Sequence, residues 1–457
     1  MTDSTQVDVV VLGLGPGGEH AAAELAKAGL EVVGVDRRLV GGECPYFGCI
    51  PSKMMVRAAG LVAEAKRIPG VAGTVEVRPS WEPVARRIRD EATDDWDDAV
   101  AVERLEKAGA RFVRGTGRLT GPRTVRVDTA DGPVDLTARR GVVLNTGTEP
   151  AVPPIDGLAG TPYWTNRDAV RVTELPKSLI VLGGGAIGCE LAQAFARFGV
   201  PVTIVEAGER ILGPEEPEAS SVVAEALEAD GVTVLTGVAA SSVRHDGAFE
   251  LTLADGTAIR SAELLVAAGR RTNLADIGLD SVGLDPSARS LDPDEQMRVA
   301  DGLWAIGDIT GKGAFTHVSM YQAAVTIRSI LGQDGPWADY RAVGRATFTD
   351  PEVGSVGMTE VQAREAGIDV QVGVTDLASS SRGWLHGPGG AGVIKLVADA
   401  SRGVLVGGTT VGPSGGEMLG WVATAVHAEV PIATLRAMHF AYPTFHRAIE
   451  TALADLG

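Results

Sequence analysis

Short runs of apolar residues recur along the chain, and most of them end at a glycine or an acidic residue. Residues 9–12 and 179–182 are each followed by a glycine-rich turn, while residues 142–144 and 264–266 run into Gly147 and Gly269. Apolar runs of this length, bounded by turn residues, are typical of strands buried within a sheet. The pattern therefore predicts buried strands in two similar units, which follow one another within the first 270 residues.

Beyond about residue 342 the pattern of apolar and polar positions changes. Strands at 393–397 and 403–407 indicate an antiparallel sheet, and helices are expected near 416–430 and 447–456. Earlier in the chain, a helix is expected to start at Pro51, and a charged stretch predicts a second helix from about residue 80 to residue 107. Residues 382–387 are rich in turn formers, which predicts a loop to which no role is assigned.

Both of the early units place a glycine turn between a strand and a helix and carry an acid at the same later position. The first glycine of such a turn permits the tight bend, the second lets the backbone approach a pyrophosphate, and the third lets helix and strand pack closely. The pyrophosphate lies at the start of the helix, and the acid holds ribose hydroxyls. The residues are Gly13, Gly15, Gly18 and Asp36 in the first unit, and Gly183, Gly185, Gly188 and Glu206 in the second.

Length and composition narrow the function classes. A chain of 457 residues suggests about three domains, and the proline-rich residues 150–154 mark a boundary between two of them. The net charge of −18 argues against nucleic acid or an anionic membrane as partner. No apolar run is long enough for a membrane span, and the first strand begins too early to leave room for a signal peptide. We therefore expect a cytoplasmic protein without a metal site.

Two of the three cysteines, Cys44 and Cys49, lie close together before the helix expected at Pro51. In a reducing compartment a close cysteine pair is more often catalytic than structural. Thiol–disulfide chemistry needs the two sulfurs close in space and one of them ionised, and the start of a helix favours a thiolate. The alternative, two buried structural cysteines, is disfavoured. Cys189, inside the second nucleotide unit, is interpreted as a small core residue.

With these motifs in this order, the chain resembles the class I flavoprotein disulfide reductases, the family of lipoamide dehydrogenase, glutathione reductase and mercuric reductase. The matching segments are residues 13–18, 41–53, 146–147, 183–190, 268–270, 305–308 and 348–352. The fold class that follows is α/β, with two Rossmann-like dinucleotide-binding domains and a C-terminal α+β dimerisation domain. The resemblance implies an FAD-binding domain at 1–150 and 270–340, an NAD(P)-binding domain at 151–269 and the dimerisation domain at 341–457.

The resemblance also implies roles for individual residues. Electrons would pass from the nicotinamide to the flavin and then to a Cys44–Cys49 disulfide, with Cys49 as the charge-transfer thiolate and Cys44 as the thiol that meets the substrate. Lys53 and Glu190 would form an ion pair near the flavin. The cofactor-binding residues implied in addition to the two glycine turns and their acids are Gly42, Gly147, Gly269 and Asp308. The enzyme would be a homodimer acting on a small disulfide or another small electron acceptor.

The nicotinamide cofactor is expected to be NADH, with NADPH possible. A carboxylate at Glu206 accepts a hydrogen bond from the ribose 2′-hydroxyl and repels a 2′-phosphate. Glu209 adds to this preference, whereas the nearby Arg210 weakens it.

The chain departs from the family near its C-terminus. Disulfide reductases of the family carry a histidine and a glutamate that serve as the acid–base for the partner subunit's dithiol, but here Tyr442 and Arg447 occupy these places. A phenol is a poor base at neutral pH, and an arginine cannot orient an imidazolium. His439 and His446 lie nearby and could substitute, but the preferred interpretation is that they are surface or packing residues. Mercuric reductases also have tyrosine in this place, yet they bear C-terminal cysteines that this chain lacks.

Three alternatives to disulfide reduction stay open. The flavin could reduce a quinone or a dye directly, as in diaphorases, or the protein could reduce a metal ion, as Tyr442 suggests. A flavin-binding protein without turnover belongs to a different class, and it is disfavoured by the intact cysteine pair together with Lys53 and Glu190.

Overall fold

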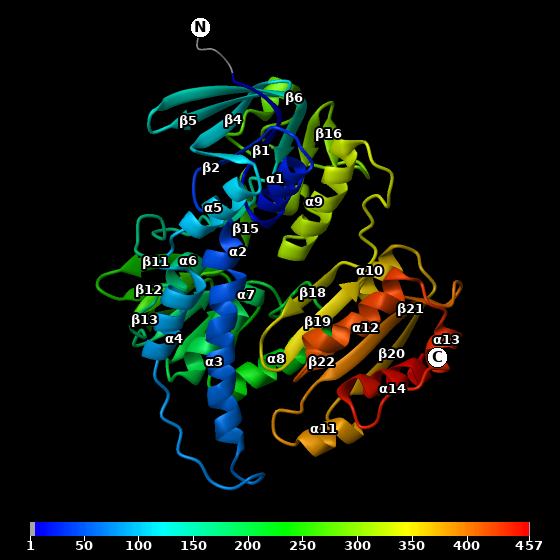
Figure 1. Cartoon of the computed structure of the whole chain (residues 1–457). Helices are drawn as coiled ribbons and strands as arrows, with labels where there is room; N and C mark the ends of the chain where they lie inside the picture. The colour runs from blue at the N-terminus through cyan, green and yellow to red at the C-terminus, as the bar shows by residue number, and fades with distance from the viewer. Residues whose placement is uncertain (1–4, 457) are drawn as a thin grey trace. The chain divides into compact units, whose positions relative to one another are not determined.

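The computed structural model describes residues 5–456, which divide into two compact units (Figure 1). The first unit contains the chain up to Pro51, Ile88–Pro150 and Arg270–Tyr340, and the second contains Ser52–Arg87, Ala151–Gly269 and the chain from Arg341 onward. The chain changes unit after Pro51, Arg87, Pro150, Gly269 and Tyr340, and the last three points lie next to the boundaries expected from the sequence. The second unit holds both the second nucleotide region and the C-terminal region, so the three-domain division stays a prediction.

The first unit is built on a mainly parallel sheet with the strand order β16-β17-β6-β1-β2-β3. The hairpin β4–β5 extends it by pairing antiparallel with the first half of β6. Helices α1 and α9 pack against each other beside the sheet (Figure 1). The strands are β1 Thr5–Leu12, β2 Val32–Asp36, β3 Arg111–Arg114, β4 Thr116–Gly121, β5 Thr124–Thr129, β6 Gly132–Leu144, β16 Arg298–Ala300 and β17 Leu303–Ala305, and the two helices are α1 Pro16–Lys27 and α9 Thr316–Leu331.

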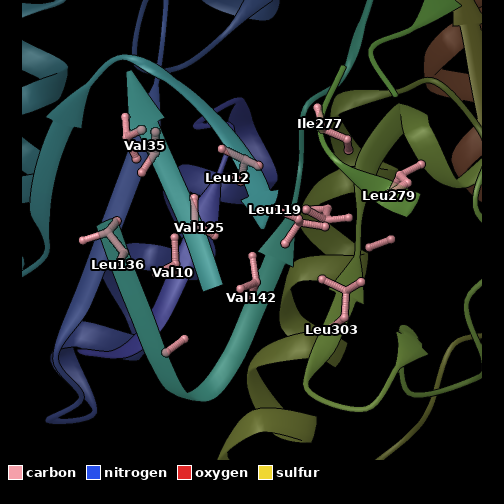
Figure 2. Close-up of a cluster of buried hydrophobic side chains, with 14 of the residues drawn as sticks. Val10, Leu12, Val35, Leu119, Val125, Leu136, Val142, Ile277, Leu279 and Leu303 are labelled. Carbon is pink, nitrogen blue, oxygen red and sulfur yellow. The ribbon is translucent and has the colours of Figure 1, made fainter. Parts of the chain in front are cut away.

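The apolar strands predicted from the sequence form the core of this unit. One cluster fills the space between the central sheet and the β4–β5 hairpin, where Val10, Val125 and Leu136 are buried together (Figure 2). A second cluster lies on the other face, where Val9 and Leu25 pack among residues of α1 and α9. Burying both faces of the sheet is what a parallel arrangement requires, and this explains the continuous apolar runs.

The segment between the cysteines and the hairpin differs from the predicted helices. Helix α3 (Cys49–Arg67) begins two residues before Pro51 and continues past Gly60. The single helix predicted for residues 80–107 is wrong, because the chain forms α4 (Glu82–Arg87), a short π-helical turn and α5 (Ala99–Lys107). Asp94, Asp95 and Trp96 have left-handed backbone angles, with φ of 48°, 54° and 59°, which end the helical path.

Short elements complete the first unit around the sheet. They are α2 Glu43–Tyr46, β7 Thr148–Pro150, β15 Arg270–Thr272 and the 3₁₀ turns η2 Leu279–Val282 and η3 Gly307–Thr310. Strands β7 and β15 pair antiparallel at the point where the chain leaves and re-enters this unit. The points where the chain leaves this unit after Pro150 and returns at Arg270 are therefore joined by backbone pairing.

The second unit repeats the nucleotide-binding arrangement on a smaller parallel sheet with the order β10-β9-β8-β14. A three-stranded antiparallel sheet, β11-β12-β13, shares a buried cluster with it that includes Leu158 and Phe249. The elements are α6 Asn166–Ala169, β8 Leu179–Leu182, α7 Ala186–Arg197, β9 Val202–Val205, α8 Pro217–Ala229, β10 Thr233–Leu235, β11 Ala240–His245, β12 Phe249–Leu253, β13 Ala258–Ser261 and β14 Glu263–Val266.

The C-terminal region contains the predicted antiparallel sheet, in the order β18-β19-β22-β21-β20. Helix α12 packs against β19 and β22, and α14 packs against β20 (Figure 1). The loop predicted at 382–387 is instead part of helix α11, whose first turn is capped by the Ser380 hydroxyl. The elements are β18 Gly344–Thr347, β19 Glu352–Gly357, α10 Glu360–Glu365, β20 Val370–Asp376, α11 Ser381–His386, β21 Val393–Asp399, β22 Val404–Gly412, α12 Gly415–His427, α13 Ile432–Arg436, η4 Phe445–Arg447 and α14 Ala448–Asp455.

Candidate functional site

The first glycine turn joins β1 to α1 and leaves no room for larger residues. A Cβ atom on Gly13, whose φ is +96°, would lie 2.3 Å from the carbonyl oxygen of Asn145. A Cβ atom on Gly18 would lie 2.0 Å from the carbonyl oxygen of Gly13, so this glycine sets how closely α1 approaches the turn. Gly15 is the residue before α1, at the donor-rich start of that helix. The turn has the shape that a pyrophosphate needs.

Asp36 lies at the end of β2, directly against this turn. Its carboxylate accepts hydrogen bonds from the backbone N–H of Leu14 at 2.7 Å and of Arg38 at 2.8 Å. Burial raises the pKa of Asp36 above its usual range, although both hydrogen bonds act in the opposite direction. A carboxylate fixed beside the glycine turn is positioned to accept hydrogen bonds from ribose hydroxyls.

The cysteine segment packs against the same turn. A Cβ atom on Gly42, whose φ is +71°, would come within 2.8 Å of the Cα of Gly15. Cys44 follows in α2 and is partly buried, whereas Cys49 is the first residue of α3 and is exposed. The two cysteines are thiols that contact each other, and the interaction with Cys49 is the largest contribution to the pKa of Cys44. The pair is thus close enough for dithiol–disulfide chemistry.

The Thr316 hydroxyl connects the two sulfurs. Its Oγ1 lies 3.6 Å from Cys49 Sγ, and it also hydrogen-bonds with Cys44. The neighbouring Cys49 thiol and burial both raise the pKa of Cys44, and Thr316 counteracts them. The sequence did not indicate Thr316, because it begins α9 far along the chain from the cysteines and belongs to none of the recognised motifs.

A chain of polar contacts leads from the cysteine segment to Asp308. Arg270 Nη2 lies 3.6 Å from Glu43 Oε2, and Arg270 Nε donates to Thr148 Oγ1 at 2.7 Å. Thr148 in turn donates to Asp308 Oδ2 at 2.6 Å. Gly147, with φ of +63°, precedes Thr148 and has open space where a Cβ would lie. The structure thus brings Asp308 and Gly147 close together, through partners that the sequence did not single out.

Lys53 and Glu190 form a short ion pair in the second unit. Lys53 Nζ lies 2.7 Å from Glu190 Oε2, and only 5% of the Glu190 side chain is exposed. The other carboxylate oxygen of Glu190 accepts from the backbone N–H of Phe348 at 2.8 Å, and the Lys53 ammonium lies 4.7 Å from the centre of the Phe348 ring. Glu190 therefore fixes Lys53 from α7, while α3 carries the lysine one helical turn after Cys49.

The second glycine turn has the same steric limits as the first. A Cβ atom on Gly183, whose φ is +112°, would lie 2.4 Å from the carbonyl oxygen of Ala267. A Cβ atom on Gly188 would lie 2.0 Å from the carbonyl oxygen of Gly183, whereas the position beside Gly185 is open. Gly269, with φ of +113°, is likewise open on its Cβ side. The open position at Gly185 allows a ligand to approach the backbone at the start of α7.

A pocket of about 330 Å³ adjoins this turn and contains the predicted specificity residues. Glu206 Oε2 accepts from Gly184 N–H at 2.6 Å, and its Oε1 accepts from Gly208 N–H at 2.7 Å. Arg210 donates to the carbonyl oxygens of Gly213 and Glu215 at 2.7 Å and 2.9 Å, so it braces the loop. The lining residues are Gly184, Gly185, Glu206, Gly208, Glu209, Arg210, Gly213 and Pro214.

Tyr442 is 68% exposed and lies before η4 in the C-terminal region. The Arg447 guanidinium lies 5.3 Å from the centre of the Tyr442 ring, and Arg447 also pairs with Glu450 at 3.0 Å. His446 packs near the Phe440 ring, and His439 is exposed. In the part of the chain that the structure describes, this segment therefore presents a phenol and a guanidinium in place of an imidazole and a carboxylate.

Among residues 5–456, no group of three histidine, cysteine, aspartate or glutamate side chains is arranged to hold a metal ion. Within the same residues, no helix is both long enough and apolar enough to cross a membrane.

Comparison with known proteins gives one consistent result over the whole chain. Residues 7–323 match the pyridine nucleotide-disulphide oxidoreductase family, and residues 343–453 match the dimerisation domain of that family. The chain is 33% identical to the dihydrolipoyl dehydrogenase of Chlorobaculum tepidum over 99% of its own length and 98% of that protein. It is 32% identical to the mercuric reductase of Acidithiobacillus ferrooxidans over 98% of its own length and 82% of that protein.

Solved structures of the same family have the same fold. A Cu(II) complex of RclA, an HOCl-induced flavoprotein disulfide reductase from Escherichia coli, matches with a TM-score of 0.86 and 27% identity, covering 98% of this chain and 99% of that one. LpdA from Mycobacterium tuberculosis matches with a TM-score of 0.86 and 26% identity, covering 99% and 100% of the two chains. These matches confirm the α/β fold with two Rossmann-type domains and a C-terminal dimerisation domain that the sequence predicted.

The family match also confirms the cofactors and the reaction class predicted from the sequence. Proteins of this family use FAD and NAD(P), and the two glycine turns described above have the steric form that such dinucleotides require. The chain is therefore an FAD- and NAD(P)-dependent disulfide oxidoreductase that belongs to the pyridine nucleotide-disulphide oxidoreductase family.

Proposed function

We propose that this enzyme uses NAD(P)H to reduce the Cys44–Cys49 pair and passes the electrons to a small acceptor other than lipoamide. The observation that supports this proposal is the Tyr442–Arg447 pair, in which a guanidinium lies 5.3 Å from the phenol ring. In the lipoamide dehydrogenases that the chain resembles, a histidine and a glutamate do the proton transfer. A phenol beside a cation is a poor substitute for that pair.

The first glycine turn and its neighbours would hold the FAD. Gly13, Gly15 and Gly18 give the pyrophosphate access to the start of α1, and Asp36 accepts from the ribose. Gly42, Gly147 and Asp308 lie around the same turn and along the polar chain that starts at Glu43. Bound FAD supplies the two-electron relay between the nicotinamide and the thiols. Lys53, fixed by Glu190, would supply positive charge beside it.

The second glycine turn would hold the nicotinamide cofactor, with NADH preferred. Gly183, Gly185 and Gly188 would accept the pyrophosphate, and Gly269 lies three residues beyond the end of β14 in the same sheet's loop region. Glu206 is held by two backbone N–H groups at the rim of the pocket, where a 2′-phosphate would meet its negative charge. Arg210 Nη2 donates to the carbonyl oxygens of Gly213 and Glu215, so the preference for NADH is attributed to Glu206.

The thiol step has a defined balance of electrons and protons. Two electrons and two protons convert the Cys44–Cys49 disulfide to the dithiol. The Cys44 thiolate then attacks an acceptor disulfide and forms a mixed disulfide with one acceptor sulfur, releasing the other as a thiolate. The Cys49 thiolate attacks the Cys44 sulfur of this mixed disulfide, which re-forms the Cys44–Cys49 bond and releases the acceptor, which takes up two protons as a dithiol. The pKa of Cys44 is raised by Cys49 and by burial, so this attack needs a proton acceptor at neutral pH. The absence of the family's histidine at position 442 makes that step slow.

Reduction of a soft or redox-active metal ion is the second candidate function. It is favoured by the copper-bound state of the E. coli neighbour and by the two adjacent thiols, because thiolates are ligands that bind Cu(I) preferentially. The dithiol would give one electron to each of two Cu(II) ions and release two protons as it forms the disulfide. Here the metal is a substrate, and the reaction needs no imidazole base.

A homodimer in the cytoplasm would suit both functions. The C-terminal region matches the dimerisation domain of the family, and we propose that Tyr442 of each chain meets the Cys44 thiol of the partner. A reducing cytoplasm would keep a dithiol competent for turnover.

A panel of acceptors distinguishes these functions. Purified FAD-loaded protein is assayed with NADH against lipoamide, glutathione disulfide, a quinone and Cu(II), alongside the Cys44→Ser and Cys49→Ser variants. Slow lipoamide turnover with faster, cysteine-dependent reduction of another acceptor supports the proposal. Equal quinone rates in all three proteins would indicate direct reduction at the flavin. Lipoamide turnover at a rate typical of dihydrolipoyl dehydrogenases would refute the proposal.

A further inference from the structure

An open hollow of about 680 Å³ lies in the first unit, and its lining contains no residue of either glycine turn. Its volume is in the range of small-molecule sites. The lining contains three arginines and two aspartates, and we call it the arginine cavity. The residues are Arg123, Arg140, Asp294, Arg298, Val299, Ala300, Asp301, Gly302, Trp304, Ser329 and Ile330.

The arginine cavity lies at the amino ends of the parallel strands, whereas the glycine turn lies at their carboxyl ends. Strand β17 runs parallel to the second half of β6, with Leu303 beside Val142 at their amino ends. Gly302 and Arg140 precede these ends and line the cavity. The glycine turn follows the carboxyl end of β1, where dinucleotides bind in such sheets. A ligand in the arginine cavity would therefore not overlap with the FAD.

Each of the three guanidinium groups is held by a hydrogen bond on one side. Arg123 Nη1 donates to the carbonyl oxygen of Arg139 at 3.2 Å, and Arg140 Nη1 donates to that of Ile330 at 3.1 Å. Arg298 Nε donates to Ser329 Oγ at 3.3 Å, and Ser329 also accepts from the indole N–H of Trp304 at 3.0 Å. The arginines are thereby oriented without all of their donors being used.

Gly302 makes room for the Arg123 side chain. Its φ is +65°, and a Cβ there would lie 2.4 Å from Arg123 Nε. Arg123 therefore lies against the bare backbone at the cavity wall. A glycine at this place serves the position of the arginine as well as the bend of the chain.

The arginine cavity is lined by more cationic than anionic side chains. Asp301 pairs with Arg123 at 2.9 Å, and Asp294 accepts from the backbone N–H groups of Gln296 and Arg298. Among residues 5–456, neither Arg140 nor Arg298 forms an ion pair; the charge of Arg140 lowers the pKa of Asp8, but Asp8 pairs with Arg139. Other arginines of the same sheet are paired: Arg126 makes two hydrogen bonds of 2.8 Å to Asp135.

We propose that the arginine cavity binds a phosphate-bearing small anion between Arg140 and Arg298, at a site separate from FAD and NAD(P). Guanidinium donors match phosphate oxygens in geometry and charge, and two unpaired guanidinium groups in a protein of net charge −18 mark this place as an anion site. The phosphate could be free or part of a nucleotide.

Isothermal titration calorimetry tests this inference on the FAD-loaded protein. The titrants are inorganic phosphate, pyrophosphate and ATP, in a chloride buffer with saturating NAD⁺ to fill the second nucleotide turn. Arg140→Gln and Arg298→Gln are each expected to weaken binding by about tenfold or more, since each removes charge-assisted hydrogen bonds. Arg126→Gln is the matched control and should leave the affinity unchanged. FAD content and NADH oxidation with a dye acceptor should be the same in all four proteins.

Each outcome decides the question. Tighter binding of inorganic phosphate or pyrophosphate than of ATP, lost in both cavity variants, supports a free phosphate ligand, and the reverse order supports a nucleotide. Binding that is equally weak in wild type and in both cavity variants means an adventitious ion only and overturns the proposal. No binding of any titrant, or an equal loss in the Arg126→Gln control, overturns it as well.

Discussion

At the scale of single residues, the glycines and acids of the two turns were predictable and the environment of the thiols was not. Gly13, Gly18, Gly183 and Gly188 each carry a steric reason that acts within a short stretch of chain, so a spacing rule finds them. Thr316 reaches the cysteines only because α9 folds back beside α1. Contacts of this kind depend on the whole sheet and leave no local signature in one sequence.

Replacing Thr316 with valine should impair the thiol pair without altering its packing. Valine has the same shape but no hydroxyl, and that hydroxyl counteracts the effects of Cys49 and burial, which raise the pKa of Cys44. Its loss should raise this pKa further, so alkylation of the reduced protein at neutral pH should slow. Thr316→Ser keeps the hydroxyl and should restore the wild-type rate. A pH profile of iodoacetamide alkylation checks this, and identical profiles for valine and wild type would contradict it.

The Tyr442–Arg447 pair gives the second prediction at this scale. If proton transfer limits disulfide turnover, then Tyr442→His together with Arg447→Glu should raise it, within the range of about 10²–10⁴ that general acid–base catalysis contributes. Each single change should do less, because a carboxylate helps only when there is an imidazole to orient. Dye reduction by NADH should stay constant in all variants. Equal disulfide rates in wild type and double variant would point to another base, with His439 or His446 the first residues to replace.

At the scale of elements, the apolar runs predicted β1 and β6 of the first parallel sheet and β8 and β14 of the second, and the change of pattern near residue 342 predicted the antiparallel sheet. The helix expected from 80 to 107 failed because three consecutive residues, Asp94 to Trp96, take left-handed angles. None of the three is glycine, so composition gave no sign of the break. Helix α11 was missed because its six residues include a glycine and follow two serines, which are typical of a turn.

The two helices α1 and α3 allow a matched test of how glycine acts in each. Gly18→Ala places a methyl group 2.0 Å from the carbonyl oxygen of Gly13 and should displace α1, with loss of bound FAD and of stability. Gly60→Ala in the middle of α3 meets open space and should stabilise the protein by about 0.5–1 kcal/mol. Flavin absorbance per chain and thermal unfolding measure both effects. Full FAD retention in Gly18→Ala would refute the steric argument.

Asp350 links α3 to α7 and predicts a pH-dependent contribution to stability. It accepts from Arg67 and Arg197, each at 2.7 Å. Burial raises the pKa of Asp350, but the two arginines outweigh it, so the pKa lies below its usual value in the folded protein. This stabilisation is present above the unfolded pKa near 4 and is lost as the pH falls through the lower folded value.

Asp350→Asn should cost roughly 2–4 kcal/mol at neutral pH and less in acid. Urea unfolding at several pH values checks this, and a cost that does not shrink in acid would contradict it.

At the scale of the whole molecule, duplication of the glycine turn predicted two dinucleotide sites, and the family match bears out both cofactors. The arginine cavity was beyond prediction, because its three arginines come from separate segments of the chain and carry no motif. The overall charge of −18 argued only against nucleic acid or an anionic membrane as partner, and it gave no sign of a local cluster of arginines. Net charge describes the average surface, whereas a binding site depends on the few charges that meet in one place.

The last prediction concerns the assembly. Large apolar side chains of the C-terminal region are exposed in the single chain, with Trp384 at 76%, Leu385 at 54% and Tyr442 at 68%. A homodimer formed through this region would remove part of that surface from water and would complete each active site with residues of the partner. Light scattering should therefore give twice the chain mass of 47.2 kDa.

Leu385→Asp combined with Tyr442→Asp should shift the protein toward the monomer and lower thiol-dependent turnover while FAD stays bound. Val100→Asp, at an equally exposed position in α5, is the control and should stay dimeric. A wild-type monomer with full activity would exclude this assembly as a functional requirement.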